Sequence, residues 1–329
     1  MRKRARTLKK IAILTSGGDA PGMNAAIRSI IRVANYRGIK TCGVMRGYQG
    51  LIRSEIVPLG PRDVSDIIQK GGTILKTSRS KEFHTQAGRK KAKTNLEAHQ
   101  IDALLVIGGN GTYRGAYELS KLWKGRIIGL PGTIDNDLFG TDFTIGYDTA
   151  VNTAVEAIDK VRDTAESHER IFLVEVMGRD AGFIALDAGI CGGAEDVLVP
   201  ELETDIRAVC RHLCAGEKRG KTSSIIIVAE GDREGGAFEI AKKLKAMSGG
   251  EYRVVILGYL QRGGVPTASD RKLATELGAF ALEKVLEGKT GVAVGKVKGK
   301  LVTTVFPHTW RRKKKLDDFL LKILPILAT

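Results

Sequence analysis

Two aspartates stand close together after an apolar segment near the middle of the chain. Asp135 and Asp137 lie in the stretch Pro-Gly-Thr-Ile-Asp-Asn-Asp, which covers residues 131–137. One carboxylate of such a pair can accept the proton of an attacking hydroxyl, and the other can hold Mg²⁺ beside a transferring phosphoryl group. The structural alternative is that both aspartates cap a turn. The reactive interpretation therefore requires phosphate-binding groups in the same region.

Two glycine-rich segments could supply such groups. Ser-Gly-Gly-Asp-Ala-Pro-Gly-Met-Asn (16–24) and Gly-Gly-Asn-Gly-Thr (108–112) each separate a strand-like segment from a helix-like one. Glycine lets backbone N–H groups approach an anion, and the N-terminus of the following helix attracts it. The GxxxxGK[ST] pattern of a Walker loop is absent. The first segment is also compatible with a plain turn, and the second occurs in several kinase superfamilies, so together they predict a class of chemistry rather than a substrate.

Several arginines are expected at the ends of strands. The planar guanidinium group binds phosphate through two parallel hydrogen bonds, which a neighbouring glycine makes easier to reach. Single arginines are usually surface residues, but two of these lie beside glycines, in MGRDAG and QRGG. The set predicts that the acceptor substrate, like the donor, carries phosphate. Its members are Arg79, Arg170, Arg179, Arg253 and Arg262.

The chain alternates segments of strand and helix character, and this order must position the motifs. Aliphatic runs predict strands over 10–16, 40–46, 102–109, 126–132, 170–178, 221–231 and 252–260. Helical spacing of apolar residues predicts helices over 25–38, 61–72, 113–123, 146–167, 204–215, 236–247, 269–286 and 316–327. This rhythm predicts open, parallel sheets. Ligands bind such sheets at the carboxyl ends of the strands, where the glycine-rich segments and the aspartate pair fall.

The composition is that of a soluble globular protein. The chain has 329 residues, of which 43% are hydrophobic and 27% are charged. No apolar run reaches the ~20 residues that span a bilayer, and the basic N-terminus lacks the apolar core of a secretory signal. Cys210 and Cys214 are four residues apart, but no set of cysteines has the spacing of a metal site. We therefore expect reduced thiols and a cytoplasmic location.

The formal net charge of +16 suggests nucleic-acid binding at first sight. Six of the positive charges lie in residues 2–10 and five in residues 311–315, and neither run contains an acidic residue. The remaining chain is only weakly basic and has no recognisable nucleic-acid-binding motif. We expect solvated basic ends and anion-binding arginines rather than a nucleic-acid partner.

Five motifs occur in a fixed order: TSGGDAPGMNAAIR, IGGxGT, PGTIDND, VEVMGR and LGxxQRGG. On these motifs the chain resembles the bacterial-type ATP-dependent 6-phosphofructokinase family, from residue 10 to about residue 300. The resemblance implies two Rossmann-like, doubly wound αβα sandwich domains with mostly parallel sheets. A larger ATP-binding domain would comprise 1–146 and 261–312, and a smaller fructose 6-phosphate-binding domain would comprise 147–260 and 313–329.

The resemblance also implies a reaction and an assembly. Mg-ATP would transfer a phosphoryl group to the 1-hydroxyl of fructose 6-phosphate, giving fructose 1,6-bisphosphate and ADP, which is the committed step of glycolysis. Members of the family are homotetramers, and their bacterial forms bind ADP or phosphoenolpyruvate as effectors between subunits. The matching effector positions are Arg28, Arg32, Arg162, Glu195, Arg219 and Lys221.

Roles at the active site follow from the same resemblance. Asp135 would be the general base, assisted by Thr133 and Arg179, while Arg79 and the Gly18 N–H would stabilise the transferred group. The ATP site would comprise Gly18, Tyr48, Arg79, Ser80, Gly109, Asn110, Gly111, Thr112 and Gly115. Fructose 6-phosphate would contact Thr133, Asp135, Arg170, Met177, Gly178, Arg179, Glu230, Arg253, Tyr259 and Arg262, with Arg170 and Arg253 coming from a neighbouring subunit. Asn110 and Asp137 would serve the magnesium site.

The chain departs from the family pattern at several positions. Asn110 replaces a magnesium-site aspartate, which weakens the expected metal affinity, and Tyr259 replaces a histidine near the sugar phosphate. His84, Arg114, Ser223 and the Pro61–Arg62 pair also differ from the usual residues. Gly111 and Gly132 stand where pyrophosphate-dependent relatives have Asp and Lys, so the sequence favours ATP as donor. The alternatives are a pyrophosphate-dependent enzyme, a catalytically weakened regulatory paralogue, and a lipid or NAD kinase that shares only GGxGT.

Overall fold

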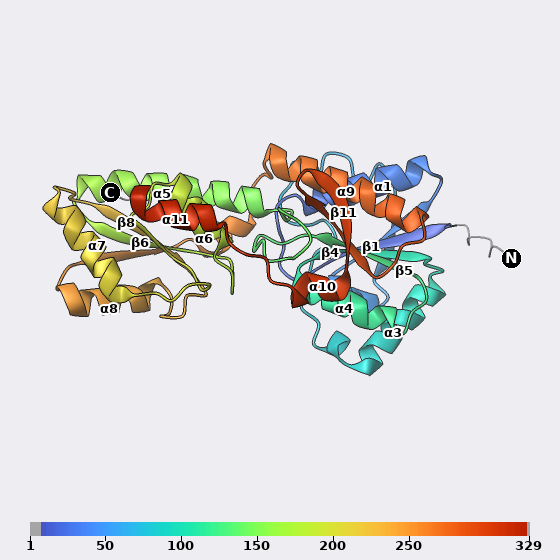
Figure 1. The fold of residues 1–329 in the computed structure, drawn as a ribbon. Helices are drawn as coiled ribbons and strands as arrows, with labels where there is room; N and C mark the ends of the chain where they lie inside the picture. Colours follow the sequence, from blue (N-terminus) through green and yellow to red (C-terminus); the bar gives the residue numbers. More distant parts are fainter. Residues whose placement is uncertain (1–7, 328–329) are drawn as a thin grey trace. The chain divides into compact units, whose positions relative to one another are not determined.

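The computed structural model describes residues 8–327 (Figure 1), so most of the basic N-terminal run lies outside the described residues. The strands are β1 (Lys10–Ser16), β2 (Lys40–Val44), β3 (Ile56–Leu59), β4 (Ala103–Gly108), β5 (Arg126–Pro131), β6 (Ile171–Val176), β7 (Asp196–Leu198), β8 (Ser224–Ala229), β9 (Tyr252–Ile256), β10 (Val292–Val297) and β11 (Lys300–Val305). The α-helices are α1 (Met23–Tyr36), α2 (Gly47–Ile52), α3 (Gln86–Ala98), α4 (Asn110–Ser120), α5 (Tyr147–Ser167), α6 (Phe183–Cys191), α7 (Ile206–Lys218), α8 (Ala237–Ser248), α9 (Ala268–Leu286), α10 (Phe306–Arg311) and α11 (Asp318–Leu327). Two short 3₁₀ helices, η1 and η2, cover Glu82–His84 and Gly258–Arg262.

The described chain forms two compact units. Unit 1 comprises residues up to Thr133, Leu138–Asp148 and Arg262–Lys313, and unit 2 comprises Ile134–Asp137, Thr149–Gln261 and the residues from Lys314 onward. The chain therefore passes between the units more than once. Which unit binds which substrate stays a prediction.

Unit 1 is built on a seven-stranded sheet with the strand order β11-β10-β5-β4-β1-β2-β3. The five central strands, from β10 to β2, are parallel, and an antiparallel strand closes each edge. Helices α1 and α9 cover one face, while α3, α4 and α10 lie on the other (Figure 1). This arrangement confirms the expected mostly parallel sheet.

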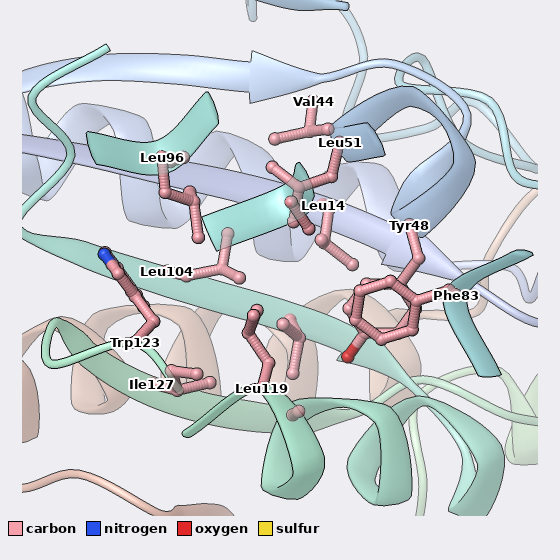
Figure 2. Packing of buried hydrophobic residues seen from close by; sticks show 14 of the residues in the cluster. Leu14, Val44, Tyr48, Leu51, Phe83, Leu96, Leu104, Leu119, Trp123 and Ile127 are labelled. Atoms are coloured by element: carbon pink, nitrogen blue, oxygen red, sulfur yellow. The ribbon is translucent and has the colours of Figure 1, made fainter. Parts of the chain in front are cut away.

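Side-chain alternation along the strands of unit 1 builds its core. Leu14 of β1 and Leu104 of β4 point to the same face, where they meet Leu51 of α2, Leu96 of α3 and Leu119 of α4 (Figure 2). All five side chains are fully buried. Burial of one such leucine contributes about 1.5–3 kcal/mol, so this layer anchors the strand ends that carry the glycine-rich loops.

Unit 2 has a four-stranded, wholly parallel sheet with the order β7-β8-β6-β9. Helices α7 and α8 cover one face, and α5, α6 and α11 lie on the other (Figure 1). Every residue of β8 is buried, as expected for a central strand covered on both faces. Unit 2 therefore also has the predicted layered α/β architecture.

The helix predicted over residues 61–72 is wrong, because the segment consists of turns. Val64 and Ile67 are buried and three residues apart, which produced the helical spacing. Asp66 has a left-handed backbone (φ 52°), however, and the Asn24 amide donates to the carbonyls of Lys70 and Gly71. These side-chain bonds hold the segment as a loop that packs against α1.

Within residues 8–327, no helix is both long and apolar enough to cross a membrane.

Candidate active site

The first glycine-rich segment forms the turn between β1 and α1. Gly17 and Gly22 have φ values of 91° and 99°, which L side chains rarely adopt, so the turn depends on glycine at both positions. A Cβ atom on Gly18 would lie 3.1 Å from the Arg262 guanidinium. The structure thus brings together two predicted site residues far apart in sequence, a backbone N–H and an arginine that can both bind phosphate.

The second glycine-rich segment runs from the end of β4 into α4. Asn110 is the first residue of the helix, and Gly111 beside it is exposed with open space where a Cβ would lie. The helix N-terminus therefore presents its N–H groups and positive dipole end to any anion in that space.

Thr112 links the two glycine-rich segments through a hydrogen bond. Its hydroxyl donates to the Ser16 carbonyl at the end of β1, over 2.8 Å. Its own carbonyl accepts a 2.6 Å hydrogen bond from the buried Tyr48 hydroxyl. Gly108 must be glycine, because a Cβ there would collide with Thr112 and with the Ser16 carbonyl. The two loops therefore form one rigid cradle rather than two independent turns.

Tyr48 and Gly115, both predicted at the ATP site, are packed against each other. The Tyr48 ring stacks on Phe83 with 3.9 Å between centroids, and both rings press on Gly115, where a Cβ would lie 2.8 Å from Tyr48. Burial raises the pKa of Tyr48 well above the ordinary range for tyrosine, so its hydroxyl stays protonated and keeps its bond to Thr112. Tyr48 thus supports the cradle through its hydroxyl and its ring.

The loop that carries Arg79 and Ser80 is fixed at the edge of this cradle. The Thr15 hydroxyl donates to the Lys76 carbonyl, and the Thr77 hydroxyl donates to the Gly17 carbonyl, each over 2.8 Å. Ser80 is buried and donates to the Gln49 side chain. Arg79 is exposed, so its guanidinium can contact an anion that binds at the protein surface.

The aspartate pair follows β5. Gly132 packs so closely on Ile107 and Met23 that a Cβ would lie 2.7 Å from Ile107. Asp135 and Asp137 are half-buried. Asn136 between them is buried and has a left-handed backbone with φ 52°.

The end of β6 in unit 2 holds the other predicted catalytic arginine in an unusual backbone. Arg179 has φ 55°, and one oxygen of Glu230 accepts hydrogen bonds from the N–H groups of Gly178 (3.3 Å) and Arg179 (2.7 Å). A Cβ on Gly231 would collide with the Arg179 carbonyl. Glu230, predicted as a sugar ligand, therefore also shapes the loop of Arg179. Met177, at the start of that loop, is buried.

Two of the predicted site arginines lie at the other edge of the unit 2 sheet from Arg179. Arg170 directly precedes β6 and Arg253 is the second residue of β9, so both lie at the amino-terminal edge of the sheet. Arg179 follows the carboxyl end of β6, about 20 Å away at 3.3 Å per residue. Both arginines thus lie at the starts of the predicted strands 170–178 and 252–260, at the edge of the sheet opposite Arg179. Tyr259, in η2, is 79% exposed.

No cluster of three or more histidine, cysteine, aspartate or glutamate side chains suited to a metal ion is found in the part of the chain that the structure describes. Magnesium in phosphoryl-transfer sites is commonly held by only one or two carboxylates together with substrate phosphates. Asp137 is half-buried and Asn110 begins α4, and each carries a side-chain oxygen.

The family model described as "Phosphofructokinase" matches residues 10–285. The chain belongs to the phosphofructokinase family. It is 54% identical over 321 residues to the ATP-dependent 6-phosphofructokinase 1 of Thermus thermophilus, covering 98% of this chain and 100% of that protein. It is 52% identical to the ATP-dependent 6-phosphofructokinase of Clostridium botulinum, with the same coverage.

Solved structures of the phosphofructokinase family have the same fold. The phosphofructokinase of Saccharomyces cerevisiae superposes with a TM-score of 0.87 at 33% identity, covering 97% of this chain. The chain spans about half of that longer protein (47%). A pyrophosphate-dependent phosphofructokinase from Marinobacter aquaeolei superposes with a TM-score of 0.83 at 24% identity, over 94% of this chain and 86% of that one, which shows the shared fold alone.

The residues predicted to form a phosphofructokinase effector site fall in both units. In unit 2, Glu195, Arg219 and Lys221 line one pocket of about 190 Å³ together with His212 and Leu324. Arg162 of the same unit donates instead to the carbonyls of Gly192 and Gly193. In unit 1, Arg28 is half-buried and Arg32 is exposed, one turn apart on α1.

Sequence reasoning missed three side-chain hydrogen bonds that fix the cradle to neighbouring loops. Thr15, Thr77 and Asn24 each bond the backbone of a neighbouring loop, at positions that no spacing rule relates to those loops. Asn24 was visible as the polar residue of a glycine-rich turn. No feature of the sequence indicated the Thr77 hydrogen bond, because its partner Gly17 is 60 residues away.

Proposed function

We propose that this chain is an ATP-dependent 6-phosphofructokinase that acts in the cytoplasm. It transfers a phosphoryl group from ATP to the 1-hydroxyl of fructose 6-phosphate and releases fructose 1,6-bisphosphate and ADP. The observation that carries the proposal is the cradle of unit 1, in which two glycine-rich loops are cross-linked by Thr112 and Arg262 lies against Gly18. Identity of 54% to a full-length enzyme of this name supports it.

Asp135 takes the proton from the attacking sugar hydroxyl in this proposal. A carboxylate beside the sugar hydroxyl can accept its proton as a general base. Thr133, two residues earlier, and Arg179 bind the developing charge. Arg79 and the Gly18 N–H stabilise the phosphoryl group in the transition state of its transfer. Interactions that strengthen only in the transition state raise the rate.

ATP is the donor rather than pyrophosphate for two steric reasons. Open space at Gly111 leaves room for the remainder of a nucleotide beyond its terminal phosphates. At Gly132, where a lysine would serve pyrophosphate, a Cβ would already crowd Ile107 and Met23. Gly109, Asn110 and Thr112 then surround the phosphates from the start of α4.

Magnesium is held by Asp137, with the Asn110 amide as a weaker partner. Both supply oxygen, the ligand that Mg²⁺ prefers. When bound, Mg²⁺ neutralises charge on the donor's phosphates. A neutral amide attracts the ion less than a carboxylate would, so we expect a higher magnesium requirement than an aspartate at this position would give.

The sugar phosphate is bound by residues from two subunits of a homotetramer. Met177, Gly178, Arg179, Glu230, Tyr259 and Arg262 belong to one subunit. Arg170 and Arg253 lie at the opposite edge of the unit 2 sheet from Arg179, which supports their use at a neighbour's site.

An anionic effector such as ADP or phosphoenolpyruvate binds where Arg219 and Lys221 line the pocket of unit 2. Lys221 lies 3.7 Å from Glu195, so a bound anion competes with that carboxylate for the lysine. Arg28, Arg32 and Arg162 supply further positive charge in the assembled enzyme.

The test is fructose 6-phosphate turnover with Mg-ATP, comparing the wild type with Asp135→Asn. The wild type should be active, and the variant should lose about 10²–10⁴-fold in kcat, the usual contribution of a general base. ATP binding without turnover by the wild type would favour the alternative of a regulatory paralogue, which the Asn110 and Tyr259 substitutions motivate.

A further inference from the structure

The Thr77 hydroxyl bonds the carbonyl of a residue in the cradle that no motif connects to it. Its Oγ1 donates to the Gly17 carbonyl over 2.8 Å. Thr77 and Gly17 are both half-buried, at the border between the protein interior and the accessible surface of the loop. The bond therefore acts at the place where an anion would enter.

The Gly17 carbonyl and the Gly18 N–H belong to the same peptide group. A peptide group is planar and trans, so its C=O and N–H bonds point in opposite directions. Because the Thr77 hydroxyl holds the Gly17 carbonyl in place, it also fixes the direction of the Gly18 N–H. A hydrogen bond to the carbonyl also polarises the N–H on the other side, which strengthens it as a donor.

This peptide group needs such a restraint more than others do. It has glycine on both sides, and Gly17 has φ 91°, so rotation of the peptide plane meets little steric resistance. After a half-rotation, the carbonyl oxygen would face the phosphate in place of the N–H. An oxygen with partial negative charge there would repel the group that the cradle must bind.

The Gly18 N–H is available to a ligand. Within residues 8–327 it has no hydrogen-bond acceptor in the protein. The Arg262 guanidinium lies beside the same residue, so a phosphoryl oxygen could meet a neutral donor and a positive charge together.

We propose that Thr77 is a positioning residue for phosphoryl transfer, which holds the Gly17–Gly18 peptide so that its N–H points to the transferred group. This inference rests on the proposed function. Thr77 itself need not touch the substrate. Its effect is on the transition state, because misdirecting one donor lowers the rate more than it weakens substrate binding.

The loop around Thr77 is held independently of this bond, so its loss can be studied in a folded protein. The Arg46 N–H donates to the Leu75 carbonyl, Thr15 to the Lys76 carbonyl, and Ser78 to the Arg46 carbonyl, each over 2.8 Å. These bonds flank Thr77 on both sides.

The experiment compares Thr77→Val, which keeps the shape and removes the donor, with Thr77→Ser, which keeps the donor. Thr275→Val is the matched control, because Thr275 donates in the same way to the Arg271 carbonyl on α9, over 2.7 Å. We expect kcat of Thr77→Val to fall by about 10- to 100-fold, somewhat less than removal of an oxyanion-type donor. The KM for fructose 6-phosphate should change by less than about threefold, with Thr77→Ser and Thr275→Val close to wild type.

Thr77→Val with wild-type kcat would overturn the inference and leave the proposed function intact. Equal losses in Thr77→Val and Thr77→Ser would also overturn it, because the hydroxyl would then not be the cause. An inactive wild type would overturn the proposed function and this inference with it. If Thr77→Val does not fold, Thr77→Ala replaces it, with the same expectation against Thr77→Ser.

Discussion

Asn110 is the residue at which this chain departs most directly from what phosphoryl transfer requires. It begins α4, is half-buried, and stands beside the open space at Gly111. An amide oxygen can ligate Mg²⁺ but carries no charge. Asn110 begins a helix and its side chain is not needed by the core, so we expect the missing charge to affect the proposed metal affinity rather than the fold.

We therefore expect Asn110→Asp to lower the Mg²⁺ concentration for half-maximal turnover by about fivefold or more, the factor that ~1 kcal/mol of Coulomb attraction supplies at a hydrated site. Titration of turnover with Mg²⁺ at saturating ATP measures it. Asn35→Asp, at an exposed position near the end of α1, adds the same charge elsewhere and is the control. Identical titration curves for all three proteins would show that Asn110 is remote from the metal.

The elements that carry the glycine-rich loops followed from local sequence. β1, β4 and β5 have continuous apolar runs, and glycine or proline ends each run. The helix over 61–72 failed because Asn24, 40 or more residues away, holds that segment by bonds to its backbone. Spacing alone cannot foresee a tertiary restraint of that kind.

Other elements were missed for local reasons. Helix α3 buries only Gly88, Ala92 and Leu96. This apolar face is too narrow for the spacing of apolar residues to predict a helix in such a lysine-rich segment. The hairpin of β10 and β11 could have been predicted from its turn residues. Lys298 and Gly299 both have positive φ, which is the two-residue turn that lysine-glycine permits.

The site was predictable in its motifs but not in its geometry. Glu230 and Arg179 were expected to meet the same sugar, yet only the fold shows the carboxylate bonded to the arginine's own backbone. The predicted strands 170–178 and 252–260 put Arg170 and Arg253 at their starts, and the structure places both at the amino-terminal edge of the unit 2 sheet.

The loop that contains Arg179 is packed closely against Gly231, so a larger residue there should displace it. Gly231→Ala places a methyl group against the Arg179 carbonyl and should displace the loop, at a strain of about 1–3 kcal/mol. We expect the KM for fructose 6-phosphate to rise about tenfold while the KM for ATP stays near wild type, as steady-state kinetics can show. Gly60→Ala, where the nearest atom lies 3.7 Å from the new Cβ, is the control. An unchanged KM for the sugar would disconnect this loop from the substrate.

At the scale of the whole molecule, the opposite positions of Arg179 and Arg253 on the unit 2 sheet predict sites shared between subunits. In the proposed function, Asp135→Asn removes the base from its own site, whereas Arg253→Ser removes a phosphate ligand from a neighbour's site. Mixed and reassembled, the two weakly active variants should regain a sizeable fraction of wild-type turnover, because some sites then receive both intact residues. Activity no higher than the mean of the two separate variants would mean that each site is complete within one subunit.

The function of this chain is to phosphorylate fructose 6-phosphate with ATP. The most direct measurement is phosphorus NMR of fructose 6-phosphate incubated with the wild-type protein and Mg²⁺, with ATP or pyrophosphate supplied in parallel. We predict fructose 1,6-bisphosphate and ADP in the ATP sample and no bisphosphate in the pyrophosphate sample, as the open space at Gly111 and the crowded Gly132 require. Bisphosphate formed only from pyrophosphate, or from neither donor, would show that the chain is not an ATP-dependent 6-phosphofructokinase.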